Sequence, residues 1–316
     1  MDPRERRRRW VTSGRPFGEP TDRIGAWWAV LGHDVPVLTT SAVRVLGESD
    51  VPAVLAFLGR DPVANVFVES RVRLGGGRAF RMGGELWGYA PGGELRGLCY
   101  SGANLVPACD ERDGLIGFAE RALRSGRRCS SVVGPADQVA VVWEQLAAEW
   151  GPGREVRSDQ PLMSMSVDPL AAADPTVRLV RPDELDALLP ASVAMFTEEV
   201  GVSPLAHDGG AMYRARVSEL VHGHRSFARF DDGRVVFKAE VGAVSPTVAQ
   251  VQGVWVTPER RGEGLAVPGM AAVVAMARRT LAPTISLYVN GYNVPALRTY
   301  ERVGFRRVGT FSTVLF

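Results

Sequence analysis

The chain has 316 residues, of which 46% are apolar, a mean hydropathy close to zero and a formal net charge of +2. This length predicts two domains, and the near-neutral charge without interleaved basic and aromatic residues argues against nucleic-acid binding. We expect no membrane helix, because no stretch approaches the roughly 18 consecutive apolar residues that one needs.

The compartment is predicted from the cysteines and from the start of the chain. Three cysteines without a Cys-x-x-Cys spacing suggest neither a disulfide framework nor a zinc site. The basic run of residues 6–9 leads into the polar letters VTSGRPFG after Trp10, which is unlike a signal peptide. We therefore expect a cytoplasmic protein.

Residues 1–40 are predicted to be a flexible extension outside the folded core. They contain the basic letters RERRRR and several glycines and prolines, and they show no clear periodicity. We assign this basic run no function, because short charged ends are usually solvated.

Two segments of the chain echo each other. The letters VRVLGESDVPAVL begin at residue 43 and VRLVRPDELDALL at residue 177, an offset of 177 − 43 = 134 with matching apolar and acidic positions. Each segment is typical of a strand that enters a helix. Between them Pro169 and Pro175 bracket small residues in the manner of a linker, so we predict one domain over 41–168 and another over 175–316.

The same order of elements continues in both halves. In the first half, apolar spacing predicts a helix through Leu115 and Ala122, a strand at CSSVV and a second helix over 139–150. In the second half, it predicts a helix through Ala271 and Ala277, a strand at ISLYV, a helix at ALRTYERV and a final strand at GTFSTVLF. Both halves are predicted to be α+β.

The segment VWVTPERRGEGLA in the second half is typical of an anion-binding turn. An apolar strand runs into a turn that opens a helix, where backbone N–H groups lack helical partners and favour an anion. Gly262 and Gly264 allow a ligand to approach the backbone closely. A P-loop is excluded because the sole lysine, Lys238, is distant, and a dinucleotide fingerprint would need Gly or Ala where Val267 stands.

Two sequence blocks of the second half resemble the GNAT acetyltransferase superfamily. The first is Arg261-x-x-Gly264-x-Ala266, preceded by a strand and Pro-Glu. The second lies at the spacing typical of the family and comprises Asn290, Asn293, Ala296, Tyr300, Gly304 and Phe305. The resemblance is specific over 177–316, whereas 43–167 share only the order of elements.

This resemblance implies two GNAT-like domains, each a mixed, mostly antiparallel twisted sheet flanked by helices. It implies acetyl-CoA as the acyl donor, with its pantetheine arm alongside the splayed fourth strand and near Asn293. By resemblance, the strand residues are Val254, Trp255 and Val256, and the pyrophosphate turn comprises Arg261, Gly262, Glu263, Gly264, Leu265 and Ala266. Gly253 within that strand favours a bulge.

The implied reaction is attack of an amine on the thioester carbon of acetyl-CoA. Tyr300 is the candidate acid that protonates the departing thiolate, although a core tyrosine is the alternative. Glu240 is the catalytic candidate for the base, with the pair Glu198 and Glu199 as another possibility. We expect no metal ion, because a lone His-x-His at 222–224 lacks further ligands.

The first half lacks the turn signature and reads ANLVPACDERDG at that place, where carboxylates would repel pyrophosphate. We therefore expect one active site per chain, in an N-acetyltransferase that acts on a small-molecule or protein amine. The alternative is a non-catalytic acyl-CoA-binding sensor or regulatory protein. Neither the acceptor nor the oligomeric state follows from the sequence.

Overall fold

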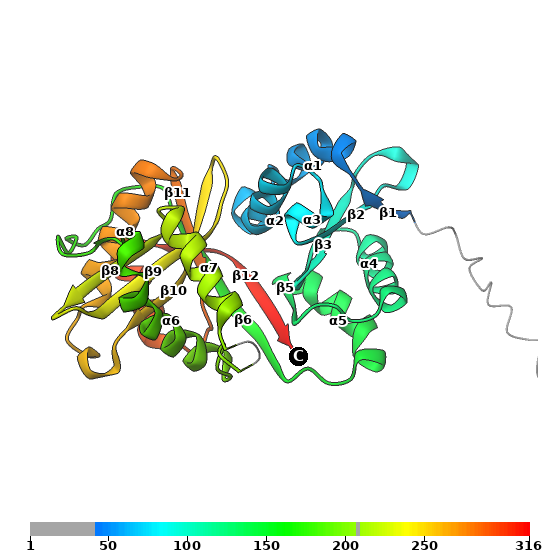
Figure 1. The fold of residues 1–316 in the computed structure, drawn as a ribbon. Coiled ribbons are helices and arrows are strands. Elements are labelled where there is room, and N and C mark those ends of the chain that lie inside the picture. Colours follow the sequence, from blue (N-terminus) through cyan, green and yellow to red (C-terminus); the bar gives the residue numbers. More distant parts are fainter. Residues whose placement is uncertain (1–41, 207–208) are drawn as a thin grey trace, which may run out of the picture. The chain divides into compact units, whose positions relative to one another are not determined.

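The computed structural model describes residues 42–206 and 209–316 (Figure 1). The predicted extension of residues 1–40 lies outside this range. Residues 41–316 form one compact unit.

The first half begins with the predicted strand and helix, continues with two further helices and three strands, and ends with the predicted helix, strand and helix before its last strand. The strands are β1 (Val43–Leu46), β2 (Gly84–Tyr89), β3 (Gly97–Gly102), β4 (Asn104–Cys109), β5 (Ser131–Pro135) and β6 (Glu155–Met165). The α-helices are α1 (Val51–Leu58), α2 (Pro62–Gly75), α3 (Ala79–Met82), α4 (Arg112–Ser125) and α5 (Ala136–Trp150).

The second half repeats this order. Its strands are β7 (Arg178–Leu179), β8 (Ser226–Asp231), β9 (Arg234–Val244), β10 (Val248–Val256), β11 (Thr284–Tyr288) and β12 (Arg306–Leu315). Its α-helices are α6 (Leu185–Val200), α7 (Ala211–His222), α8 (Ala266–Thr280) and α9 (Val294–Val303). Four short 3-10 helices complete the described elements: Glu48–Asp50, Pro91–Gly93, Pro182–Glu184 and Pro258–Arg260.

The repeat at an offset of 134 extends to individual hydrogen bonds. In β1 the Arg44 guanidinium pairs with Asp50 at 2.6 and 3.0 Å, and Asp50 accepts from the Gly47 N–H. In β7 the Arg178 guanidinium pairs with Glu184 at 2.7 and 2.8 Å, and Glu184 accepts from the Arg181 N–H. The same carboxylate position therefore ties the strand to the following helix in both halves.

One mixed, mostly antiparallel sheet of twelve strands runs through the described residues in the order β1-β2-β3-β4-β5-β12-β6-β11-β10-β9-β8-β7. The predicted mixed, mostly antiparallel sheet flanked by helices is confirmed. The last strand of each half crosses into the other: β12 pairs with β5, and β6 pairs with β11 (Figure 1). Strands β6 and β12 also pair with each other along most of their length. Each half therefore completes its sheet with a strand that the sequence order assigns to the other.

The hydrophobic core follows the same division. The largest cluster lies between the second-half sheet and helices α8 and α9 and includes Phe237, Ile285 and Tyr300. The corresponding cluster of the first half includes Phe118 and Val142, and Val314 of β12 packs into it. Exchange of the two strands thus places second-half side chains in the first-half core.

Candidate active site

The predicted anion-binding turn lies between β10 and α8, where residues 257–265 connect strand to helix. Within the described residues, none of the backbone N–H groups of 262–267 has an intramolecular acceptor. The next N–H along the chain that has one is that of Gly269, which donates to the Leu265 carbonyl at 3.1 Å. Six consecutive N–H groups at the positive end of a 15-residue helix are therefore available to an anion.

The two glycines of the turn adopt backbone conformations that other residues rarely reach. Gly262 has φ +85° and Gly264 has φ +81°. A Cβ atom built at either position would meet nothing within 4 Å, so the space beside both glycines is open. The glycines are thus required by the left-handed backbone, and they leave the N–H groups accessible.

Two arginines hold the turn through carboxylates. Arg260 contacts Glu263 at 2.6 Å and Asp231 at 2.7 Å. Arg261 donates to the Val256 carbonyl at 3.1 Å and to Glu198 at 2.7 Å. The motif arginine therefore ties the end of α6 to the turn.

The strands β10 and β11 separate beside this turn. Their parallel pairing covers only 248–250 of β10 against 284–286 of β11. From Val251 to Val256, β10 pairs with β9 on one side only, while Leu287 and Tyr288 of β11 pair with β6. The edge of β10 that carries Val254, Trp255 and Val256 is thus free to bind an extended chain by backbone hydrogen bonds.

A bulge interrupts β10 at Gly253, as the sequence predicts. The register with β9 shifts between Gln252 and Trp255, and Gly253 has φ +59°. The Nζ of Lys238 donates to the Gly253 carbonyl at 3.2 Å and to Glu240 at 3.1 Å. The other carboxylate oxygen of Glu240 accepts from Gln252 at 3.0 Å. A buried ion pair therefore fixes the carbonyl of the bulge.

The candidate base Glu240 is 6% exposed, and Lys238 is 1% exposed. Lys238 and Gln252 each donate to one oxygen of the buried Glu240 carboxylate. Its role as a base stays a prediction.

Tyr300 lies on α9, where it is 7% exposed and packs edge-on against Phe305 at 5.9 Å between ring centroids. Burial, and to a lesser degree the negative charge of Glu199, raise the pKa of the Tyr300 hydroxyl well above its ordinary value. The phenol therefore keeps its proton at neutral pH, as a proton donor must. Asn293 caps the same helix by accepting from the Ala296 N–H at 3.2 Å.

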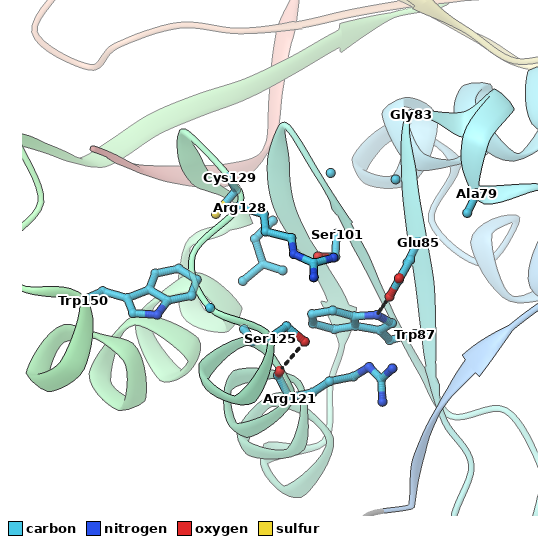
Figure 2. A pocket seen from close by; sticks show the side chains of 15 residues that line it. Ala79, Gly83, Glu85, Trp87, Ser101, Arg121, Ser125, Arg128, Cys129 and Trp150 are labelled. Atoms are coloured by element: carbon cyan, nitrogen blue, oxygen red, sulfur yellow. Dashed lines mark hydrogen bonds between the residues drawn. The ribbon is translucent and has the colours of Figure 1, made fainter.

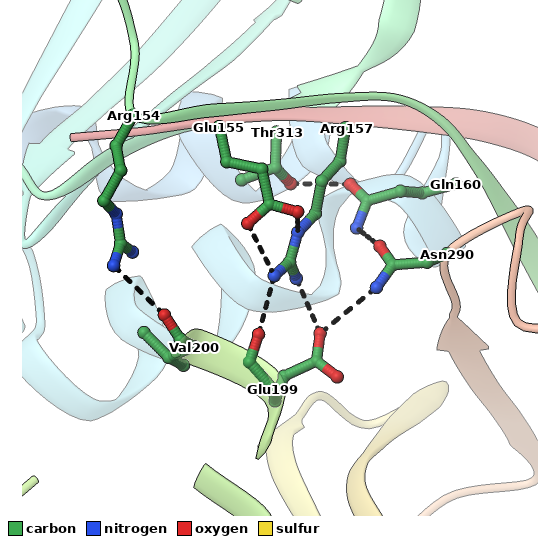
Figure 3. Close-up of polar contacts among 8 residues, drawn as sticks. All are labelled: Arg154, Glu155, Arg157, Gln160, Glu199, Val200, Asn290 and Thr313. Carbon is green, nitrogen blue, oxygen red and sulfur yellow. Dashed lines mark hydrogen bonds and ion pairs between the residues drawn. The ribbon is translucent and has the colours of Figure 1, made fainter. Parts of the chain in front are cut away.

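A polar network brings the exchanged strand β6 to this site (Figure 3). Arg157 of β6 pairs with Glu199 at 2.6 Å and also donates to the Glu199 backbone carbonyl. Glu199 accepts from Asn290 at 3.3 Å, and Gln160 of β6 donates to Asn290 at 2.9 Å. Thr313 of β12 completes the chain by donating to Gln160. Two β6 residues thereby position groups at the carboxyl end of β11.

The sequence provides no pattern that could identify Arg157 and Gln160 as members of this network. Both lie in a strand of ordinary composition, more than 100 residues from Asn290 in sequence. Only the strand exchange brings them together.

The corresponding junction of the first half is closed. Only residues 110 and 111 connect β4 to α4, so the turn is absent. The buried Gln138 side chain accepts from the Cys109 backbone N–H at 3.0 Å and donates to Asp110 at 3.2 Å. Arg96 pairs with Glu111 at 2.7 Å. The backbone group at the end of β4 is therefore already satisfied from within the chain.

Over residues 42–206 and 209–316, no group of three or more His, Cys, Asp or Glu side chains is arranged to hold a metal ion. No described helix is long and apolar enough to cross a membrane.

Comparison with known families divides the chain in two. Residues 193–305 match the Acetyltransferase (GNAT) family, and residues 84–188 match a domain of unknown function, DUF4081. No curated protein matches the chain.

Solved structures of similar fold cover nearly the whole described unit. A Drosophila protein aligns with a TM-score of 0.61 at 13% identity, covering 87% of this chain and 98% of that one. A tandem GNAT protein from the clavulanic acid biosynthesis pathway aligns with a TM-score of 0.52 at 15% identity, covering 86% and 98%. A GNAT-family acetyltransferase from Colwellia psychrerythraea aligns with a TM-score of 0.51 at 13% identity, covering 87% and 99%. At these identities the likeness concerns the fold.

Proposed function

We propose that the second half of this chain, of which residues 193–305 match the GNAT acetyltransferase family, transfers an acetyl group from acetyl-CoA to an amine. The observation that carries the proposal is the row of unpartnered N–H groups at 262–267 beside the free edge of β10. The first suits the pyrophosphate of acetyl-CoA, and the second suits its amide-containing pantetheine arm.

In the proposed reaction the amine nitrogen attacks the thioester carbon, and the carbon–sulfur bond breaks as coenzyme A leaves. The thiolate takes a proton from Tyr300, and the amine loses one to a carboxylate. Glu199 suits that second role better than Glu240, because half of its side chain is exposed and its charge acts on Tyr300. Arg157 holds its carboxylate in place.

The binding step is tested by calorimetric titration of acetyl-CoA into wild type and three variants. Gly264→Glu places a carboxylate among the N–H groups, and we expect binding to weaken more than 100-fold. Gly264→Ala keeps the backbone strain without the charge and should lose much less. Gly233→Glu has the same strain and charge at an open turn with φ +74° outside the site, so it should bind like wild type. Equal affinity in Gly264→Glu and wild type would refute the assigned turn.

The catalytic step is tested by release of coenzyme A thiol in the presence of a panel of amines. Tyr300→Phe and Glu199→Gln should each lower kcat about 100-fold and leave acetyl-CoA binding intact, since both act on proton transfer. Glu240→Gln should lower kcat less than Glu199→Gln does. Saturable acetyl-CoA binding with no thiol release for any amine would instead favour the non-catalytic acyl-CoA-binding protein.

A further inference from the structure

A pocket of about 350 Å³ lies in the first half, at the end of α4 opposite to the closed β4–α4 junction (Figure 2). Strands β2 and β3, the end of α4 and the last residue of α5 supply its walls. Its volume falls within the range of small-molecule sites. None of the residues of the proposed acetyl-CoA site lines it, so it requires a separate explanation.

Two arginines in the lining lack a carboxylate partner within the described residues. Arg121 stacks over the Trp87 ring at 5.2 Å, and its Nε is buried without a hydrogen-bond acceptor. Arg128 makes no ion pair in the described part of the chain and points toward Ser101 and Trp87 (Figure 2). Because neither guanidinium has a counter-charge within the described residues, both can attract an anion that enters the pocket.

Neighbouring arginines of the same helix behave differently. Arg112 pairs with Glu144 at 3.0 Å, and Arg124 lies 3.8 Å from Glu120. At the matching end of α8, Arg278 donates to Asp168 and to the backbone carbonyls of Ser166 and Pro283. Of the three arginines of α4, Arg121 alone therefore lacks a carboxylate partner within the described residues.

The remaining walls suit a flat apolar body. Trp150 contributes an indole ring (Figure 2), whereas Trp87 is only 2% exposed and Arg121 covers one of its faces. The Trp87 N–H donates to one oxygen of Glu85 at 2.9 Å, which fixes that carboxylate and leaves its other oxygen for a ligand donor. Ser101 adds a hydroxyl.

We propose that this pocket binds a small organic anion, with a carboxylate or phosphate near Arg121 and Arg128 and a flat apolar body against Trp150. The first half, with its closed β4–α4 junction, is then a ligand-binding domain in its own right. The net positive lining selects the anion, and the indole of Trp150 favours a flat body.

The test uses two probes with the same body, 2-naphthoate and 2-naphthyl phosphate, titrated calorimetrically into the full chain saturated with acetyl-CoA. We expect at least one to bind with a stoichiometry near one. Arg128→Met and Arg121→Met should each weaken it about tenfold, whereas Arg124→Met, outside the pocket on the same helix, should not. Uncharged 2-naphthylmethanol should bind at least tenfold more weakly than the better anion.

The head group follows from which probe binds more tightly. Because Arg121→Met also removes the contact with Trp87, thermal unfolding and Arg121→Lys, which keeps the charge, distinguish misfolding from loss of the anion contact. Binding of neither probe, or equal affinity in Arg128→Met and Arg124→Met, would overturn the proposal. Binding only in the absence of acetyl-CoA would place the probe in the α8 site and would overturn it too.

Discussion

The two halves share one order of elements and differ at the junction between the fourth strand and the following helix. In the second half nine residues, 257–265, form an open turn, whereas in the first half two residues, 110 and 111, suffice. Counted from the helix start, Gln138 of α5 corresponds to Ala296 of α9, and Val142 to Tyr300. The first half therefore lacks the turn, the space and the hydroxyl, although its backbone follows the same plan. The acetyl-CoA site proposed for the second half therefore has no counterpart at this junction of the first half.

The interiors of the two halves differ in the buried ion pair between Lys238 and Glu240, which only the second half contains at this place. Strand β9 carries Lys238 and Glu240, whereas the sequence of β3, its counterpart, is GLCYSG without a charge. Lys238→Met leaves the Glu240 carboxylate buried without a counter-ion, and we expect a loss of about 3–5 kcal/mol in the free energy of unfolding. Urea denaturation measures it.

The double variant Lys238→Met, Glu240→Gln is the control for this loss. It should recover most of the stability, because no uncompensated charge remains. It should still bind acetyl-CoA more weakly than wild type, since Lys238 no longer holds the Gly253 carbonyl. Wild-type stability in Lys238→Met alone would mean that the pair is not as buried as the structure has it.

The comparison of the two strand-to-helix junctions is tested by exchanging the third residues of α5 and α9, which are Gln138 and Ala296. Ala296→Gln introduces in the second half the side chain that closes the first, and we expect acetyl-CoA affinity to fall about tenfold or more. Gln138→Ala should cost about 1–3 kcal/mol by leaving the Cys109 N–H without its acceptor, and should create no acetyl-CoA site because the turn is still missing. Calorimetry and urea denaturation measure the two effects. Unchanged binding in Ala296→Gln would break the correspondence between the helices.

The sequence predicted those features that depend on residues close together in the chain. The start of α8 and the left-handed glycines of the turn follow from spacing and from the conformational range of glycine, and the bulge follows from Gly253. The repeat of 134 residues was visible in the matching apolar and acidic positions, of which Asp50 and Glu184 accept the same local hydrogen bonds.

Strand pairings and side-chain contacts between residues far apart in the sequence could not be predicted. No residue pattern in β6 specifies its partner strand, so the sequence did not predict its exchange with β12. The network of Arg157 and Gln160 and the closure by Gln138 follow from that packing. Asn293, assigned by resemblance to the pantetheine arm, serves as a helix cap in the structure, and its contact with the arm stays a prediction.

The smallest predicted change in stability concerns Asp50 and Glu184, the carboxylates at corresponding positions of the two halves. The Arg178 guanidinium, with the Arg181 N–H, lowers the pKa of Glu184 to about 2, and Arg44 lowers that of Asp50. Because the pKa is lower in the folded chain than in the unfolded one, each pair stabilises the protein above pH 4.5 and loses that effect as the pH falls toward 2. Glu184→Gln should therefore lower the melting temperature at pH 7 by a few degrees, which corresponds to about 1 kcal/mol, and change it little at pH 2.5. Asp50→Asn, at the matching position, should shift it in the same direction and by less, since the Asp50 pair is more exposed than the Glu184 pair. A variant melting temperature that stays below the wild-type value by the same amount at both pH values would show that the loss arises from packing and not from charge.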